Sequence, residues 1–385
     1  MLVQNVYDVD PRVRRKAEAL VVAGYSVDVL ALRSANGSKA YTMNGVNVHT
    51  LSLGKKRGSL ARYALEYAVF FLWALVRLTL LMRKRRYVAI DVNTLPDFLV
   101  FAAVPARLMG AKLILDMHEI TPEFYMSKYR IAAHSWVVRF LKYQEKLSFD
   151  CADHVITITE PIRDLLQSRG LDRAKSTIVM NSADETPFAS VLSRSAANPD
   201  PSKFVIMYHG TLTPVYGLDL AVEAFSLALK NMPEAELWIL GSGGEECLLT
   251  DLAKKRGVRS KVRLLGRVPF PDIPVWLCKC DAGILPMRRD VFLDFAFPNK
   301  LPEFIVMGKP VLISRLKTIA HYFSEQALAY FEPNDAADLA RQMVHLCHDR
   351  DWRTRLAAKA KEEYIPLRWD IMKRRYTDLI EQTVG

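Results

Sequence analysis

The chain has 385 residues, half of them hydrophobic and a quarter charged, which excludes a disordered or fibrous protein and suffices for two domains of ordinary size. The formal net charge is +11, and residues 1–90 carry most of the excess, with 15 lysines and arginines against 5 aspartates and glutamates. Such a basic face is typical of proteins that bind nucleic acid or an anionic membrane. The five cysteines show no paired spacing, and the close pair Cys278 and Cys280 has no further cysteine or histidine beside it to complete a zinc site. We therefore expect reduced thiols in a cytosolic protein that needs no metal.

The chain opens with MLVQNVYDVDPRVRR, which lacks the apolar region of a signal peptide. Only a short apolar piece precedes the first loop, so we expect that the first strand is clipped and that the start lies a few residues late. Asp10 and Pro11 predict the start of a helix, with Asp10 as its cap and Pro11 in its first turn. Gly24 predicts the end of that helix.

Residues 59–86 read SLARYALEYAVFFLWALVRLTLLMRKRR and form the most apolar stretch of the basic region. From Tyr67 to Val76 the only polar group is the Tyr67 hydroxyl, but Glu66 and Arg77 bracket this run. The stretch therefore lacks the roughly 20 uninterrupted apolar residues that cross a bilayer.

Four basic residues, Arg83 to Arg86, close this stretch. A strongly apolar helix with a basic end predicts a segment that lies in the plane of an anionic membrane surface, with Phe70, Phe71 and Trp73 in the lipid. A buried helix of the first domain with a solvated basic end is the main alternative, and a true membrane span is the second. Nucleic-acid binding is not expected, because the aromatic residues do not alternate with the charges as a stacking surface requires.

The rest of the chain alternates short apolar runs with helical patterns, which predicts an α/β protein with parallel sheets. We expect two Rossmann-like domains facing a central cleft: an N-terminal domain over 1–183, a linker over 184–203 and a second domain over 204–364. A C-terminal helix over 365–385 is expected to pack back toward the first domain. Strands are predicted at 25–32, 88–93, 112–117, 154–159, 176–181, 204–210, 236–243, 261–268, 282–287 and 310–314.

Ligands of open parallel sheets gather beyond the carboxyl ends of the strands. Polar residues at these ends include His118, Glu119, His209 and Arg267. Position alone favours a structural role for His118 over a functional one. The turn ILGSGGEE at 239–246 lacks the third glycine of a dinucleotide fingerprint and places two glutamates where a pyrophosphate would lie, so a nicotinamide cofactor is not expected.

The segment FPNKLPEFIVMGKPVLIS begins a helix close to Lys300, because Pro298 and Pro302 must lie in or before its first turn. Lys300 and Glu303 are three residues apart and share one face of that helix. A helix N-terminus with a lysine suits phosphate, and the carboxylate suits sugar hydroxyls. A nucleoside diphosphate has both features, although an exposed Lys–Glu pair has the same pattern.

The chain resembles the family 4 retaining glycosyltransferases, which have the GT-B fold. The resemblance rests on PNKLPEFIVMGKPVLIS, on YHGTLTPVYGLDLAVEAF at 208–225, on ELWILGSGGEE and the residues up to 287, on DVDPRVRRKAEALVVAGYSVDVLAL at 8–32, and on KLILDMHEITPE at 112–123. It covers nearly the whole chain, including YIPLRWDIMKRRYTDLIEQ near the C-terminus.

The resemblance implies transfer of a sugar from a nucleotide diphosphate donor with retention at the anomeric carbon, usually without metal or another cofactor. The second domain would hold the donor and the first would meet the acceptor. His118 and Glu303 are the catalytic candidates, with Glu303 matching the carboxylate that binds the donor ribose. The donor-binding candidates are Gly210 and Thr211, beneath the diphosphate, and Arg267, Val268, Asn299, Lys300 and Glu303.

Two features depart from the family pattern. Phe295 stands where an acidic residue is common, eight positions before Glu303, and Asp294 is the neighbouring candidate for a sugar contact. The loop at 210–217 has no cation, so Lys300, Arg288 or Arg289 would supply the charge.

We therefore expect a glycosyltransferase that acts on a lipid-linked or saccharide acceptor in surface polysaccharide synthesis. It would be peripherally bound at the inner face of the plasma membrane. A non-catalytic homologue and a nucleotide-sugar epimerase of similar fold are the alternatives.

Overall fold

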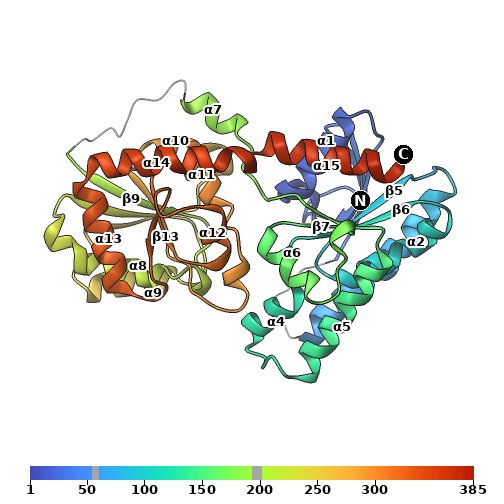
Figure 1. Ribbon diagram of the computed structural model, residues 1–385, viewed down its shortest axis with the longest axis horizontal. Coiled ribbons are helices and arrows are strands. Elements are labelled where there is room, and N and C mark those ends of the chain that lie inside the picture. Colours follow the sequence, from blue (N-terminus) through green and yellow to red (C-terminus); the bar gives the residue numbers. More distant parts are fainter. Residues whose placement is uncertain (54–59, 193–201) are drawn as a thin grey trace. The chain divides into compact units, whose positions relative to one another are not determined.

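The structure is a computed structural model that describes residues 1–53, 60–192 and 202–385. The chain forms two compact units, Met1–Asn181 with Asp370–Gly385, and Ser182–Trp369 (Figure 1). The predicted linker therefore belongs to the second unit, where Thr186–Leu192 forms helix α7. Residues 193–201 of that linker lie outside the described residues.

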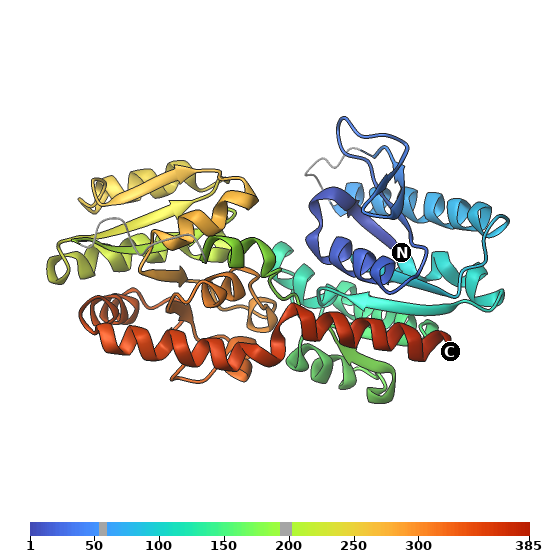
Figure 2. The ribbon, with the colours of Figure 1, turned by 90° about the horizontal axis from the view of Figure 1, so that it is seen from above.

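The first unit is built on an eight-stranded sheet with the order β3-β4-β2-β1-β5-β6-β7-β8, in which only the β3–β4 pair is antiparallel. Seen from above, helices lie on both sides of the strands (Figure 2). The strands are β1 (Leu2–Val6), β2 (Asp28–Leu32), β3 (Ala40–Met43), β4 (Val46–Leu51), β5 (Ala89–Asn93), β6 (Lys112–Met117), β7 (His154–Thr157) and β8 (Ser176–Ile178). The helices are α1 (Pro11–Val22), α2 (Leu60–Met82), the 3₁₀ helix η2 (Asp97–Ala103), α3 (Val104–Leu108), α4 (Thr121–Tyr129), α5 (Trp136–Cys151), α6 (Glu160–Gln167) and α15 (Trp369–Val384).

Sequence signals account for both ends of α1 and for most strands of this unit. The Asp10 carboxylate accepts the backbone N–H of Arg12 and Pro11 opens α1, as predicted, while Gly24 has a φ of +92° just after the helix. The hairpin of β3 and β4 was missed. Its turn is Asn44-Gly45, both with positive φ, which is the strongest short hairpin signal.

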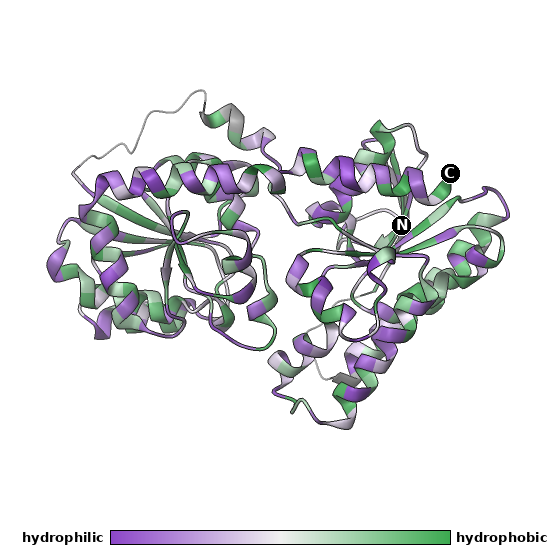
Figure 3. Ribbon diagram, in the orientation of Figure 1, coloured by the Kyte–Doolittle hydropathy of each residue, from purple (hydrophilic) through white to green (hydrophobic). Residues whose placement is uncertain are grey.

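The second unit has a six-stranded parallel sheet with the order β11-β10-β9-β12-β13-β14. Hydrophobic residues concentrate on its strands (Figure 3), because a parallel sheet is covered on both faces. The strands are β9 (Phe204–His209), β10 (Ala235–Leu240), β11 (Val262–Gly266), β12 (Ala282–Leu285), β13 (Val311–Ser314) and β14 (Ala329–Phe331). The helices are α7, α8 (Leu218–Ala228), α9 (Glu246–Lys255), α10 (Ile273–Cys278), α11 (Lys300–Val306), α12 (Lys317–Tyr322), α13 (Ala336–His348) and α14 (Arg350–Tyr364).

Helix α2 contains the apolar stretch of the basic region. In the described part of the chain it is the one helix that is long and apolar enough to cross a membrane, by length and composition alone. Phe70, Ala74 and Leu78 are fully or almost fully buried within the first unit, so one face of the helix packs against protein. The expectation that Phe70 faces lipid is therefore wrong. Both faces of α2 are apolar, and for that reason its periodicity could not show which face is inside.

Candidate active site

The side chain of Lys300 lies directly over the backbone of Gly210. Gly210 follows β9 with a φ of +133°, and Lys300 is the first residue of α11. A Cβ atom at position 210 would lie 2.0 Å from Lys300 Cε and 2.8 Å from Nζ. Only glycine leaves room for the lysine, so the two predicted donor residues form one structural element with Thr211 next to them.

The Lys300 ammonium group contacts aromatic rings rather than a carboxylate. Its Nζ lies 4.2 Å from the centre of the Tyr216 ring and 5.7 Å from that of Tyr208. Within residues 1–53, 60–192 and 202–385, no carboxylate lies within ion-pair distance of this group. Lys300 is thus a cation that a ligand phosphate can reach without breaking an ion pair.

The two other cations considered for this role are already paired. Arg288 forms an ion pair with Asp219 and donates to Asn334 at 3.2 Å. Arg289 donates to the carbonyl of Arg315 and lies 3.4 Å from Asp294. The geometry therefore favours Lys300 as the source of charge beside the 210–217 loop.

Glu303 lies one turn into α11, and its side chain is 12% exposed. Its Oε2 is 3.3 Å from Nε2 of His209, the last residue of β9. Burial lowers the pKa of His209 to about 3, and the nearby charge of Lys300 adds to this effect. The imidazole is consequently neutral at physiological pH beside the carboxylate.

The turn after β10 packs closely against the loop that follows β9. A Cβ at Gly241 would lie 1.7 Å from the carbonyl oxygen of Gly210, and one at Gly243 would lie 2.1 Å from that of Leu212. Gly241 and Gly243 of the 239–246 turn are thus required by contact between two loops.

The other predicted donor residues directly follow or precede residues of this site in the chain. The Gly241 N–H donates to the Gly266 carbonyl at 2.7 Å, so the exposed Arg267 and the half-buried Val268 follow at the same edge of the sheet. Asn299 is exposed immediately before Lys300.

Asp294 has protein partners of its own. Besides its contact with Arg289, its carboxylate accepts the backbone N–H of Lys317 at 3.4 Å. The Lys317 ammonium group lies 4.8 Å above the Phe295 ring. The carboxylate predicted to contact the sugar is therefore part of a protein network on the loop before α11.

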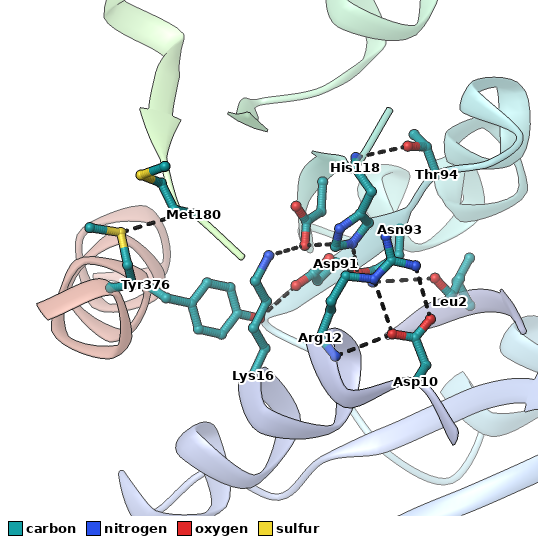
Figure 4. A network of polar contacts seen from close by, with 12 residues as sticks. Leu2, Asp10, Arg12, Lys16, Asp91, Asn93, Thr94, His118, Met180 and Tyr376 are labelled. Carbon is teal, nitrogen blue, oxygen red and sulfur yellow. Dashed lines mark hydrogen bonds and ion pairs between the residues drawn. The ribbon is translucent and has the colours of Figure 1, made fainter. Parts of the chain in front are cut away.

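In the first unit, His118 follows β6 and is 3% exposed. Its Nε2 lies 2.9 Å from Oδ1 of Asn93 and 3.4 Å from a carboxylate oxygen of Asp116, and its backbone N–H donates to Thr94 at 3.1 Å (Figure 4). Burial lowers the pKa of this imidazole although the Asp116 charge opposes the shift. His118 is thus a neutral, tightly held side chain.

Two buried carboxylates lie in the same network as this histidine, and the sequence reasoning missed one of them, Asp91. Lys16 of α1 forms an ion pair with Asp116 of β6. The Tyr376 hydroxyl of α15 donates to Asp91 of β5 at 2.5 Å. The side chains of Lys16 and Tyr376 reach toward the same region of the sheet (Figure 4). Burial, followed by the charge of Asp116, raises the pKa of Asp91 to about 6. An acidic residue inside an apolar strand was the available signal, because a buried charge needs a partner.

Family models match the sequence of both units. The model of the glycosyl transferase 4-like domain matches residues 9–182, and that of the glycosyl transferases group 1 matches residues 203–349. Together the two models cover most of the chain. The chain belongs to the family 4 glycosyltransferases. The fold is GT-B, with two parallel-sheet α/β domains.

Two curated relatives illustrate how distant the matched glycosyltransferases are. Glycogen synthase of Mycobacterium tuberculosis is 25% identical over 60% of this chain and 51% of its own length. The chain thus spans about half the length of the first curated relatives it matches. D-inositol 3-phosphate glycosyltransferase of Paenarthrobacter aurescens is 23% identical over 94% of this chain and 88% of its own.

Two solved structures share the fold of this glycosyltransferase. Sucrose-phosphate synthase of Thermosynechococcus elongatus has a TM-score of 0.75 at 18% identity, covering 96% of this chain and 92% of that one. HepE of Anabaena, in complex with UDP, has a TM-score of 0.67 at 15% identity, covering 99% of both chains.

Proposed function

We propose that the protein transfers a sugar from a nucleotide diphosphate donor to a hydroxyl group of a lipid-linked or saccharide acceptor in surface polysaccharide synthesis. The observation that carries this proposal is the placement of Lys300 over Gly210, with Glu303 one turn further along the same helix. A cation that meets no carboxylate among the described residues suits the diphosphate, and a mostly buried carboxylate suits ribose hydroxyls. The UDP complex of HepE supports a nucleotide donor for this fold.

The reaction breaks the bond between the anomeric carbon and the donor phosphate and forms one from that carbon to the acceptor oxygen. The acceptor proton leaves with the diphosphate product. Lys300 would stabilise the negative charge that grows on the leaving phosphate, because an ammonium group in a partly desolvated site acts most strongly where charge develops.

His118 would lie near the donor sugar. Its imidazole is neutral, so it would not neutralise charge. The family resemblance supports retention at the anomeric carbon and a reaction without metal.

A panel of UDP-, GDP-, ADP- and dTDP-sugars tests the donor site by calorimetry and by release of the nucleoside diphosphate. We expect one donor to bind, and Glu303→Ala to weaken its binding about tenfold or more, since a hydrogen bond to a charged group contributes about 1.5–3 kcal/mol. Glu234→Ala, an exposed glutamate of the second unit, is the matched control. Equal donor affinity in Glu303→Ala and the wild type would contradict the site assignment.

We further propose that the first unit binds the cytoplasmic face of an anionic membrane through α2. Five residues of this helix, Leu65, Val69, Leu72, Val76 and Leu80, are exposed and recur every three or four positions, so they form one apolar stripe. Arg83, Lys84 and Arg86 are exposed at its end, whereas Arg85 is held by Asp28 at 3.0 Å. Because the opposite face is buried in protein, the helix would lie in the membrane plane rather than cross it.

Helix α5 extends this surface and was missed by the sequence reasoning. Trp136, Phe140, Tyr143 and Leu147 are exposed along one face, flanked by the exposed cations Arg139 and Lys146. Both α2 and α5 pack against η2. The crossovers β4-α2-β5 and β6-α5-β7 run in the same direction across the sheet, so right-handed connections put both helices on one side of it. Aromatic residues with neighbouring cations are typical of membrane-surface helices.

A further inference from the structure

The 3₁₀ helix η4 (Pro214–Tyr216) presents an aromatic ring to the Lys300 ammonium group. The loop at 210–217 carries no cation of its own, so the positive charge beside it comes from the first residue of α11. The Lys300 Nζ lies 4.2 Å from the centre of the Tyr216 ring, and this ring is half-buried. The face of an aromatic ring carries partial negative charge and attracts an ammonium group within about 6 Å. Tyr216 thus gives the loop a means of attracting a cation from another element.

Backbone contacts fix the place of this ring. Gly217 ends η4 with a φ of +60°, and a Cβ at this position would lie 2.1 Å from the carbonyl oxygen of Pro286. The loop therefore packs directly against the residues that follow β12. The backbone N–H of Arg288 also donates to the carbonyl of Val215 at 3.1 Å. These contacts hold the backbone on both sides of Tyr216.

Tyr208 of β9 provides a second ring near the same ammonium group. Its side chain is fully buried, and its hydroxyl donates to the carbonyl of Thr211 at 2.8 Å. The centre of its ring lies 6.1 Å from that of Tyr216 and 5.7 Å from the Lys300 Nζ. Two rings therefore border the ammonium group, one from the core of the sheet and one from the loop.

We infer that Tyr216 is a positioning residue for the donor diphosphate, which acts by holding the Lys300 ammonium group over Gly210. The inference rests on the proposed function, because it explains how the cation of that site is kept in place. A lysine side chain has many rotamers, and fixing one of them costs entropy when a ligand binds. The ring reduces this cost before the ligand arrives and leaves the charge available, whereas a carboxylate partner would compete with the phosphate.

Calorimetric titration of the full chain with UDP, GDP, ADP and dTDP tests this role. Tyr216→Leu keeps an apolar side chain but removes the ring, and it should weaken binding of the preferred nucleotide about fivefold, as expected for a partly desolvated cation–π contact. Tyr216→Phe keeps the ring and should bind within about twofold of the wild type. Equal affinities of Tyr216→Leu and the wild type, or an equal loss in Tyr216→Phe, would overturn the inference.

The matched control is Trp276→Leu. It removes a half-buried ring whose centre lies 4.5 Å from the Lys279 ammonium group, on a different helix of the same unit. This change should leave nucleotide affinity as it is in the wild type. A loss as large as that of Tyr216→Leu would show that removing any such ring disturbs the unit, and it would contradict a specific role for Tyr216.

A double-mutant cycle tests whether the ring acts through the lysine. In a Lys300→Met background, Tyr216→Leu should cause no further loss of nucleotide affinity, because the ring then has no cation to hold. The same loss in both backgrounds would show that Tyr216 contacts the nucleotide itself or supports the loop, and it would contradict the inference.

An NMR measurement without ligand separates this inference from the proposed function. Ring currents shield protons above an aromatic face, so the Lys300 ε-methylene protons, assigned with the help of Lys300→Arg, should resonate upfield of those of exposed lysines. The upfield shift should persist in Tyr216→Phe and become smaller in Tyr216→Leu. Failure of all four nucleotides to bind the wild type would contradict the proposed function. A Lys300 resonance that does not respond to Tyr216→Leu would instead overturn the positioning role.

Discussion

Lys300 and Gly210 form an interlocked pair in the second unit. The lysine side chain occupies the volume that any Cβ at position 210 would need, and Gly210 has a backbone conformation that other residues rarely adopt. Gly210→Ala should therefore displace Lys300 and weaken donor binding as much as Lys300→Ala does. Calorimetric titration with the donor nucleotide checks this.

The control for this prediction is Gly257→Ala. Gly257 has a φ of +72°, and a Cβ at this position would have no neighbouring atom within 4 Å, so its substitution imposes backbone strain without displacing a side chain. It should lower the unfolding free energy by about 1–2 kcal/mol and leave donor affinity unchanged. The double variant Gly210→Ala/Lys300→Ala should bind no worse than Lys300→Ala alone, because both changes remove the same contact. Additive losses would contradict the coupling.

Acid should destabilise the second unit through His209. The pKa of this histidine is lowered to about 3 in the folded chain and is near 6.5 when unfolded, so its stabilising effect is present above about pH 6.5 and is lost as the pH falls toward 3. Between these pH values the unfolding free energy of the wild type should fall by up to about 1.4 kcal/mol per pH unit relative to that of His209→Asn. Urea unfolding at several pH values measures this difference, and parallel pH profiles would show that His209 is not responsible.

Tyr376→Phe should destabilise the first unit without touching a ligand. The substitution removes the hydroxyl that donates to the buried Asp91 at 2.5 Å, and an unsatisfied buried group costs about 1–3 kcal/mol. Tyr143→Phe, in which the hydroxyl is on an exposed side chain, should change stability little. Equal unfolding free energies for the two variants would exclude the Asp91 bond as a stabilising contact.

Membrane binding should depend on two separable groups of residues. Replacing Arg83, Lys84 and Arg86 with Ser should abolish the preference for vesicles that contain phosphatidylglycerol over neutral vesicles, since each cation near an anionic surface contributes about 1 kcal/mol. Replacing Trp136 and Phe140 with Ser should weaken the binding that resists high salt, which the apolar stripe of α2 also supports, because screening leaves apolar burial unaffected.

Leu227→Ser and Leu248→Ser, at exposed leucines of the second unit, are the matched controls for the aromatic changes. Vesicle sedimentation at low and high salt distinguishes the electrostatic contribution to membrane binding from the apolar one. Wild-type protein that stays in the supernatant with acidic vesicles would contradict the membrane proposal.

The sequence was sufficient to predict features that depend on residues close together in the chain. Pro298 and Pro302 predicted that the helix starts close to Lys300, and α11 begins at that residue. The sequence could not predict which charged residues form ion pairs. Arg288 and Asp219, for example, are far apart in the chain and meet only when the sheet forms. Sequence can place a carboxylate after a strand, but only the folded structure shows what surrounds it.

The position of α15 has a consequence for the order in which the chain folds. The first unit is made of two segments, and Tyr376 from the second of them completes the buried network of Asp91 and Lys16. The second unit is one continuous segment that is synthesised before α15. Since domains generally fold as units during synthesis, the second unit can reach its final structure on the ribosome while the first unit still waits for its last helix.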